Sequence, residues 1–369
     1  MTSKRIAVSG ADGFIGRNVQ VRLGELGMEV LPLVRTSGSD EWFCAVAQAD
    51  AIIHLAGANR PEDPAEFMAV NHGTAELLAQ AVQAAGRPVR IAFASTIRAN
   101  EPTEYGRSKL AAEDRLQRMA GETGSPLHVL RLPNVFGKWA RPNYNSAVAT
   151  FCHNIARDLP ILVNDPDAPL RLVYIDDVVA TLVSIVEGRV AKGMVELDPI
   201  FETTVGGVAE TISGFRRGRD DNVIDAVGTG LTRALYATYV SALPPHEFSY
   251  PLTLHTDQRG SFSEVLKTRT SGQFSFFTAH PGVTRGGHYH HTKTEKFLIV
   301  QGRARFRFRH ILSGERHEIE TSGEHPQVVE TVPGWSHDVT NIGETQLISL
   351  LWANEVFDRD RPDTVAGET

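Results

Sequence analysis

Cysteine is scarce in this sequence, which contains only Cys44 and Cys152 in 369 residues. A disulfide-stabilised fold and a cysteine-ligated zinc ribbon both need more cysteines than this. The shortage excludes both, and it is typical of proteins that work in a reducing compartment.

Long apolar runs and an excess of basic residues are also lacking. No segment approaches the roughly 18 apolar residues of a membrane span. With 37 basic and 44 acidic residues the net charge is −7, which does not favour a nucleic-acid binder. The first ten residues lead directly into a strand pattern, without the pattern of a signal peptide. We therefore expect a cytoplasmic protein whose partners are small molecules, not nucleic acid or a membrane.

The chain is long for a single domain, and its composition is that of a globular protein. Hydrophobic residues make up 41% and charged residues 22%. At this length two domains are the default expectation.

A glycine-rich turn follows the first expected strand, residues 5–9. Gly10, Gly13 and Gly16 precede a helical pattern that includes Val19 and Leu23. Glycines at this spacing allow a tight turn, a close approach to a pyrophosphate and tight helix packing. The pattern predicts dinucleotide binding; a glycine loop without a ligand is the alternative.

Arg35 follows the second expected strand, residues 29–34, where an NAD enzyme usually has an acidic residue. A guanidinium at this position suits the 2′-phosphate of NADP, although it could equally point to solvent. Only about sixteen residues separate this strand from the next, so one strand-helix unit is expected to be abbreviated.

Tyr105 and Lys109 are four residues apart in an expected helix and therefore share one face. A nearby ammonium favours the phenolate, which would lower the tyrosine pKa and make Tyr105 a usable acid or base. Thr96 ends the expected strand that begins at Val89, and its hydroxyl could bond the same substrate oxygen. Without the other motifs, an exposed tyrosine and lysine on a surface helix would be the simpler interpretation.

Several motifs occur together in one order: residues 10–16, 54–57, 71–74, 95–96, 105–109, 131–137 and 174–177. Over residues 1 to about 243 the chain resembles the extended short-chain dehydrogenases/reductases. The resemblance implies a Rossmann-type α/β fold with a doubly wound parallel sheet. It also implies a nucleotide-sugar substrate and a catalytic set of Thr96, Tyr105 and Lys109.

The same resemblance implies the ligand contacts of this first domain. The substrate contacts are Asn134 and Asn143. The cofactor contacts are Gly10, Asp12, Gly13, Phe14, Ile15, Gly16, Arg35, Leu55, Ala56, Gly57, Tyr105, Lys109 and Leu132. The shortened unit after Arg35 departs from the family pattern and leaves the adenine side unassigned.

The character of the chain changes after Pro244 and Pro245. Residues 206–243 are mostly helical by pattern, with the charged stretch 216–221 expected to be a solvated loop. Short strand patterns follow, and residues 303–309 alternate between apolar residues and arginine. We predict two domains, residues 1–243 and residues 246–369, of which the second is all-β.

Histidines in the second domain have the spacing of metal ligands. His288 and His290 would project from one face of a strand, and Glu295 could reach them from the next strand. Together with His337, this spacing resembles the two motifs of the cupin fold. These residues suit a divalent transition metal, with zinc as the candidate; a solvent-facing histidine strand is the alternative.

Residues 257–264 and 285–288 resemble the sugar-nucleotide 3,5-epimerases. That resemblance implies Arg259 and Glu264 as substrate contacts. It also implies that His288 acts as the catalytic base, so His288 has two competing roles, base and metal ligand. In the arginine stripe 303–309, Arg305 or Arg307 could also hold a nucleotide sugar, although a solvated face is the simpler interpretation.

Almost the whole chain resembles a family of capsular-polysaccharide enzymes that join these two domains. The resemblance implies C-3 epimerisation of a UDP-2-acetamido-2,6-dideoxy-4-hexulose, followed by NADPH-dependent reduction of its 4-keto group. The product would be a UDP-6-deoxy-L-talosamine-type precursor of UDP-N-acetyl-L-fucosamine, for capsule or O-antigen. The alternatives are an NAD-dependent 4-epimerase or dehydratase with a binding-only cupin, and a non-catalytic NADP-sensing scaffold. A homodimer is expected.

Overall fold

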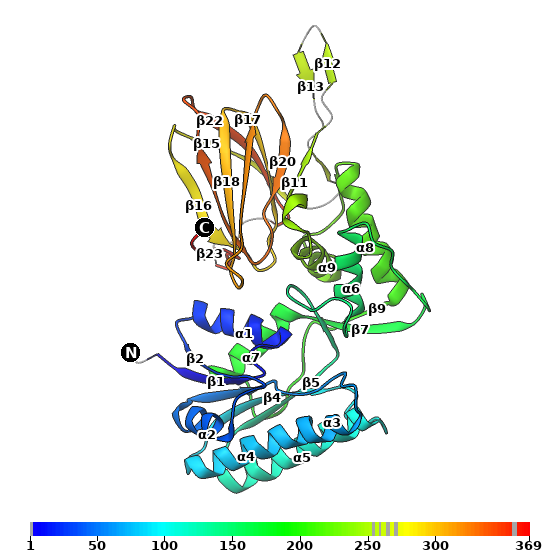
Figure 1. Ribbon diagram of the computed structural model, residues 1–369, viewed down its shortest axis with the longest axis vertical. Coiled ribbons are helices and arrows are strands. Elements are labelled where there is room, and N and C mark those ends of the chain that lie inside the picture. The colour runs from blue at the N-terminus through cyan, green and yellow to red at the C-terminus, as the bar shows by residue number, and fades with distance from the viewer. Residues whose placement is uncertain (1–2, 253–254, 258–259, 263–265, 269–271, 356–359) are drawn as a thin grey trace. The chain divides into compact units, whose positions relative to one another are not determined.

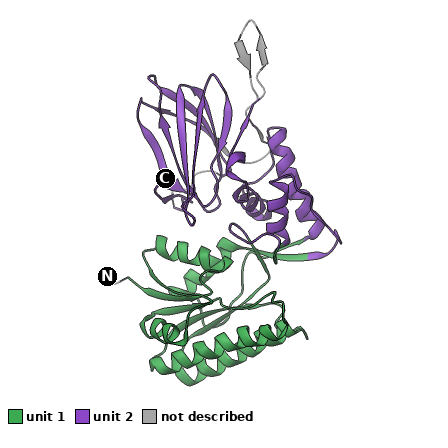
Figure 2. Ribbon diagram, viewed as in Figure 1, with its two compact units in different colours: residues 1–136, 144–146, 170–203 green, residues 137–143, 147–169, 204–369 purple. Residues whose placement is uncertain are grey.

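The chain folds into two compact units (Figure 2), seen in a computed structural model that describes residues 3–252, 255–257, 260–262, 266–268, 272–355 and 360–369. The first unit comprises residues 1–136, 144–146 and 170–203. The second comprises residues 137–143, 147–169 and 204–369. In the described part of the chain, no helix combines the length and apolar character needed to cross a membrane.

A parallel sheet forms the centre of the first unit, with strand order β2-β1-β3-β4-β5-β8. The strands are β1 (Arg5–Ser9), β2 (Glu29–Leu33), β3 (Ala51–His54), β4 (Arg90–Thr96), β5 (Leu127–Leu132) and β8 (Gly193–Met194). Every neighbouring pair is parallel. Ile6, Ala7 and Val8 are fully buried, as expected of a strand covered on both faces.

Helices cover both faces of this sheet (Figure 1), with α1 and α7 on one side and α2, α4 and α5 on the other. They are α1 (Phe14–Glu25), α2 (Ser39–Gln48), α3 (Ala65–Phe67), the π-helix η1 (Met68–His72), α4 (Gly73–Ala85), α5 (Glu104–Thr123) and α7 (Ile175–Val186). The doubly wound fold is confirmed. The abbreviated unit after Arg35 contains a short helix, α2, of ten residues.

A small sheet of β6 (Asn134–Phe136), β7 (Pro169–Tyr174) and β9 (Phe201–Thr204) follows the large one. The second unit contains the remaining helices, α6 (Ala147–Ile155), α8 (Val205–Asp220), α9 (Gly230–Ser241) and the 3₁₀ turn η2 (Pro245–Glu247). These helices therefore form one compact unit with the all-β part. The division into residues 1–243 and 246–369 stays a prediction about domains.

The charged stretch 216–221 is not the predicted solvated loop, because helix α8 continues through it to Asp220. Arg219 is buried, and its guanidinium pairs with the carboxylate of Glu330 on β20. Arg216 pairs with Asp158 at 3.0 Å and with Glu247 at 3.2 Å. Tertiary ion pairs thus satisfy these arginines within the helix, a possibility that charge composition alone did not reveal.

Two antiparallel five-stranded sheets form the all-β part, in the orders β11-β20-β17-β22-β15 and β19-β18-β21-β16-β23. Their strands are β11 (Ser249–Pro251), β15 (Gln273–Ala279), β16 (Thr284–Tyr289), β17 (Glu295–Gln301), β18 (Arg303–His310), β19 (Arg316–Ser322), β20 (Gln327–Glu330), β21 (Trp335–Asn341), β22 (Leu347–Ala353) and β23 (Val365–Ala366). The shorter strands are β10 (Val223–Ile224), β12 (His255–Asp257), β13 (Gly260–Phe262) and β14 (Lys267–Thr268). An all-β part that follows the doubly wound sheet is confirmed, and its two sheets are consistent with the cupin type.

The predicted alternation of residues 303–309 is also confirmed. On β18, Ala304, Phe306 and Phe308 are buried, and Phe306 packs its ring against that of Phe297 on β17. The two sheets therefore enclose the core of this domain between their inner faces.

Candidate active site and metal centre

The glycine-rich turn has the geometry of a phosphate-binding loop. Gly10 has φ +66°, and a Cβ there would lie 2.9 Å from the backbone nitrogen of Ala56. A Cβ on Gly16 would overlap the carbonyl oxygen of Gly10. Helix α1 begins at Phe14, directly after Asp12 and Gly13, so its free amide groups lie at this turn.

The segment after β3 lies against this turn. The hydroxyl of Ser9 accepts hydrogen bonds from the amides of Leu55 at 3.1 Å and Ala56 at 3.2 Å. A Cβ on Gly57 would lie 2.7 Å from the side-chain oxygen of Asn71. Leu55, Ala56 and Gly57 are therefore brought to the glycine turn, as the motif predicted.

Asn71 is a residue of this site to which the sequence gave no role. It is buried, accepts from the amide of Ala58 at 2.8 Å, and donates to the hydroxyl of Ser108 at 2.9 Å. Asn71 thus ties the segment after β3 to helix α5, which carries Tyr105. Its presence in the motif at 71–74 was the signal that could have identified it.

Arg35 lies just beyond the end of β2, and 86% of its side chain is exposed. Its nearest ion-pair partner, Glu66, is 3.9 Å away, a long contact in water that adds little stability. The guanidinium is therefore available to an anion.

The predicted catalytic set comes together at the end of β4 and the start of α5. Thr96 is the last residue of β4, and Tyr105 is in the first turn of α5. The hydroxyl of Thr96 lies close enough to the phenol of Tyr105 to influence its pKa. Lys109, one turn further along, is buried and donates to the carbonyl of Ala94 at 3.0 Å.

The charge state of Tyr105 differs from the sequence expectation. Burial raises the pKa of its phenol, and this outweighs the lowering by the hydroxyl of Thr96 and by the charge of Arg98. Burial also lowers the pKa of Lys109 to about 8, against the charge of Glu113. A phenol that keeps its proton at neutral pH suits a proton donor.

The remaining predicted contacts of the first domain lie at strand ends and loops. Leu132 is the buried last residue of β5. Asn134 begins β6, and its side-chain amide donates to the carbonyl of Arg171 at 3.3 Å. Asn143 belongs to the second unit, has φ +54°, and donates its backbone N–H to Thr150 at 3.0 Å.

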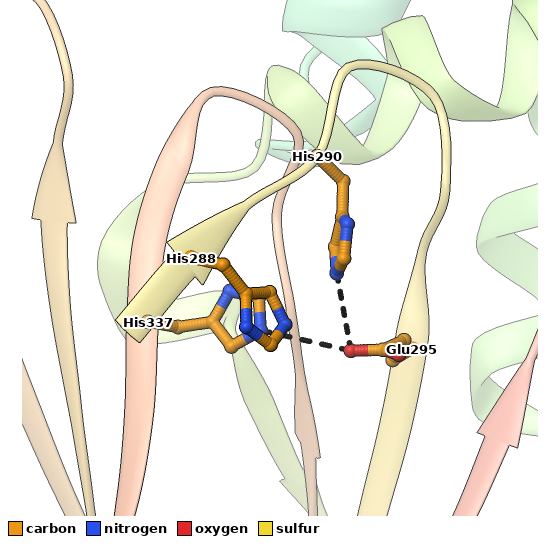
Figure 3. A group of neighbouring side chains, drawn as sticks. All are labelled: His288, His290, Glu295 and His337. Atoms are coloured by element: carbon orange, nitrogen blue, oxygen red, sulfur yellow. Dashed lines mark hydrogen bonds and ion pairs between the residues drawn. The ribbon is translucent and has the colours of Figure 1, made fainter. Parts of the chain in front are cut away.

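A separate cluster of four side chains lies inside the second unit (Figure 3). His288 is on β16, His290 just after it, Glu295 starts β17, and His337 is on β21. One ligand atom from each residue lies within 4.8 Å of those of the other three. The fold therefore brings together the four residues that their spacing predicted as ligands.

The donor atoms of this cluster fit a divalent cation. The carboxylate of Glu295 lies 3.3 Å from Nε2 of His290 and 3.6 Å from Nε2 of His337. Nε2 of His337 is buried and has no hydrogen-bond partner among the described residues. Nδ1 of His337 lies 3.4 Å from the carbonyl of Trp335, so Nε2 is the nitrogen left for a metal.

Burial and neighbouring groups shift the pKa values of His288, His337 and Glu295. Burial, with the nearby His337 and His290, lowers the pKa of His288 to about 4, and burial also lowers the pKa of His337. Burial raises the pKa of Glu295, but the adjacent imidazoles of His290 and His337 outweigh it, leaving that pKa well below its ordinary value. Neutral imidazoles and a carboxylate are what zinc and similar metals require.

Of the predicted substrate contacts of the second domain, the structure describes only Arg305, which is not at this cluster. Arg305 alternates with the buried Phe306 and Phe308, and its guanidinium bonds Glu320 at 2.9 Å. It therefore lies on the face of β18 opposite to the one that meets His337. Arg259 and Glu264 lie outside the residues that the structure describes.

A parallel sheet with a glycine-rich first turn and a Thr–Tyr–Lys set defines a nicotinamide-dependent short-chain dehydrogenase. Comparison with known families agrees. The NAD dependent epimerase/dehydratase family matches residues 6–195, and the polysaccharide biosynthesis C-terminal domain matches residues 255–365. The chain belongs to the NAD dependent epimerase/dehydratase family, which confirms a nicotinamide dinucleotide as the class of cofactor.

Some individual relatives are similar to this chain over both of its units. The UDP-2-acetamido-2,6-beta-L-arabino-hexul-4-ose reductase of Pseudomonas aeruginosa is 52% identical over 364 residues, 98% of each chain. The crystal structure of the capsular polysaccharide assembling protein CapF from Staphylococcus aureus is 36% identical, with a TM-score of 0.67. The match covers 99% of this chain and 100% of that one. The predicted resemblance to the capsular-polysaccharide enzymes is confirmed. The spore coat protein SpsL of Bacillus subtilis is 26% identical over 126 residues, 30% of this chain and 81% of its own.

Proposed function

We propose that this protein is a bifunctional nucleotide-sugar enzyme. The second domain inverts C-3 of a UDP-2-acetamido-2,6-dideoxy-4-hexulose, and the first domain then reduces the 4-keto group with NADPH. The product is a UDP-6-deoxy-L-talosamine-type precursor of UDP-N-acetyl-L-fucosamine. The relative from Pseudomonas aeruginosa, by its name a reductase of a UDP-4-hexulose, supports the substrate class.

In the reduction, Tyr105 donates its phenolic proton to the oxygen that was the 4-keto group. A bound nicotinamide supplies the hydride. Thr96, whose side chain lies near the Tyr105 phenol, forms a hydrogen bond with the same substrate oxygen and so fixes its position. The ammonium of Lys109, held by the carbonyl of Ala94, lies one helical turn from Tyr105 and stabilises the phenolate left after proton transfer.

In the epimerisation, His288 removes the C-3 proton, which the adjacent ketone acidifies, and a proton from solvent returns to the opposite face of C-3, which inverts the centre. A divalent cation bound by the cluster would stabilise the negative charge that develops on the ketone oxygen. His290, Glu295 and His337 are buried, whereas His288 is only partly buried. This difference in burial is the observation that carries the proposal, because the base must reach the substrate while the ligands need not.

Hydrogen exchange tests the proposal in one sample. The full-length protein, incubated with the 4-keto UDP-sugar in deuterated water without NADPH, should incorporate deuterium at C-3. Exchange must precede reduction, since reduction removes the carbonyl that makes the proton acidic. NMR or a gain in mass reports the result.

Two variants identify the site of exchange. His288→Ala should abolish it, and Tyr105→Phe should leave it unchanged, because Tyr105 is in the other unit. A cupin that only binds substrate, as in a 4-epimerase, a dehydratase or a plain reductase, predicts exchange no faster than in buffer. A scaffold that only senses NADP predicts, in addition, no NADPH consumption when the cofactor is added afterwards.

NADPH preference is a separate prediction that depends on Arg35. Arg35→Asp should lower the affinity for NADPH relative to NADH at least about tenfold, since a charge-assisted contact with the 2′-phosphate becomes a repulsion. Fluorescence titration with both cofactors measures the ratio. Arg118→Asp, the same change at an exposed position of α5, is the matched control. Equal affinity of the unaltered protein for NADH and NADPH would contradict the prediction.

Zinc as the metal and a homodimer as the assembly remain predictions of the sequence. The imidazoles of His290 and His337 and the carboxylate of Glu295 support zinc.

A further inference from the structure

The C-terminal segment, residues 363–369, lies along the strand that carries His288. Strand β23 pairs antiparallel with β16, with Ala366 opposite His288 and Val365 opposite Tyr289. The amide of Gly367 donates to the carbonyl of Gly287 at 3.0 Å. The last residues of the chain therefore form an edge strand beside the metal ligands.

The side chain of Asp363 holds the turn between two of these ligands. One carboxylate oxygen accepts from the amide of His291 at 2.8 Å. The other accepts from the amides of Thr292 at 2.6 Å and Lys293 at 2.7 Å, and from the hydroxyl of Thr292 at 3.0 Å. Three consecutive amides between His290 and Glu295 thus converge on one carboxylate.

The backbone of Asp363 acts on His290 itself. Its carbonyl oxygen can only accept, so Nδ1 of His290, which is hydrogen-bonded to it, carries the proton. Nε2 is then the ring nitrogen left to bind a metal, and it lies 3.3 Å from the carboxylate of Glu295, inside the cluster. A histidine ligand is commonly oriented by a hydrogen bond of this kind at its other ring nitrogen.

Thr364, the residue after Asp363, is linked to the second ligand, Glu295, through Lys293. The ammonium of Lys293 donates to the hydroxyl of Thr364 at 3.2 Å and lies 3.4 Å from Oε1 of Glu295. Lys293 is buried, so water screens its charge little and the ammonium acts on Glu295. Asp363 and Thr364 therefore contact the immediate surroundings of both His290 and Glu295.

We propose that Asp363 is a positioning residue of the metal centre: it fixes the turn 291–293 and sets the tautomer and orientation of His290. The inference rests on the metal site of the proposed function and adds a residue that lies outside the cupin motifs. If Asp363 served only to stabilise the fold, its loss would lower the melting temperature without changing how His290 is protonated or how tightly a metal is held.

Asp363→Asn tests the role, because the amide has the same shape but would place an N–H₂ group against backbone N–H donors. Glu368→Gln is the matched control, as it makes the same change of charge on an exposed side chain of the same segment. Zn²⁺ affinity is measured on the full-length proteins by competition with a chromophoric chelator. We expect a 10- to 100-fold weaker affinity for Asp363→Asn and less than a twofold change for Glu368→Gln. An Asp363→Asn protein that binds Zn²⁺ as tightly as the control would overturn the inference.

A measurement on the unaltered protein does not depend on how the variant folds. Long-range ¹H–¹⁵N NMR of the metal-free protein should show a proton on Nδ1 of His290. The Nε2–H tautomer would overturn the inference even if Zn²⁺ binds. Failure of the proposed metal site is distinguishable, since the unaltered protein would then bind no Zn²⁺ while Nδ1 of His290 still carried a proton.

Discussion

Tyr105→Phe is expected to lower the rate of ketone reduction by about 10²- to 10⁴-fold, the usual contribution of a positioned proton donor. The change removes only the phenolic oxygen. The ring of Tyr105, which lies 5.5 Å from that of Phe67, keeps its packing. Fold and cofactor binding should therefore survive while the proton for the new hydroxyl is lost.

The measurement is NADPH oxidation with the 4-keto UDP-sugar at saturating substrate, so that the loss is seen in kcat rather than in binding. Tyr239→Phe is the control, because the Tyr239 hydroxyl is buried and has no hydrogen-bond partner among the described residues. It should leave the rate within about twofold. A Tyr105→Phe enzyme that retained more than a few per cent of the rate would identify another group as the acid.

The second large effect is expected at the metal centre. Glu295→Gln should weaken Zn²⁺ binding at least about 100-fold, more than the loss of a group that only supports a ligand. The substitution preserves shape but removes the anionic ligand that faces His290 and His337. Because a metal that binds only the native state stabilises it, the rise in melting temperature on adding Zn²⁺ should also disappear.

Metal content of the gently purified full-length protein and thermal unfolding with and without Zn²⁺ measure both effects. Glu318→Gln, on an exposed position of β19, should retain one metal per chain. Less than stoichiometric metal in the unaltered protein would leave an epimerase without a metal. Undiminished binding in Glu295→Gln would show that Glu295 is not a ligand.

Spacing in the sequence was sufficient to predict which side chains lie together when the residues are close in the chain. Tyr105 and Lys109 lie on one helix, α5, which begins at Glu104 after the capping side chain of Thr103. His288 and His290 lie at the end of one strand and the turn after it. Helical and extended periodicity place such side chains on one face regardless of the rest of the fold. The glycine-rich turn was predictable for the same reason.

Contacts between residues far apart in the sequence could not be predicted from local spacing. The arginines of 216–219 were expected in a solvated loop because their charges suggest solvent exposure. In the structure Arg219 is buried against Glu330, more than a hundred residues away in the sequence. Similarly, Arg305 alternates as predicted, but only the packing of β18 shows that its face is not the one that meets the histidine cluster.

The sequence by itself determined the two fold types and the family, and it named the candidate site residues, because these depend on short motifs and their order. Tertiary structure alone decided how those residues are charged and held. The pKa of Tyr105 is raised rather than lowered because burial outweighs the local charges. His290 owes its tautomer to Asp363, 73 residues away, because only the folded chain brings that carbonyl to its ring.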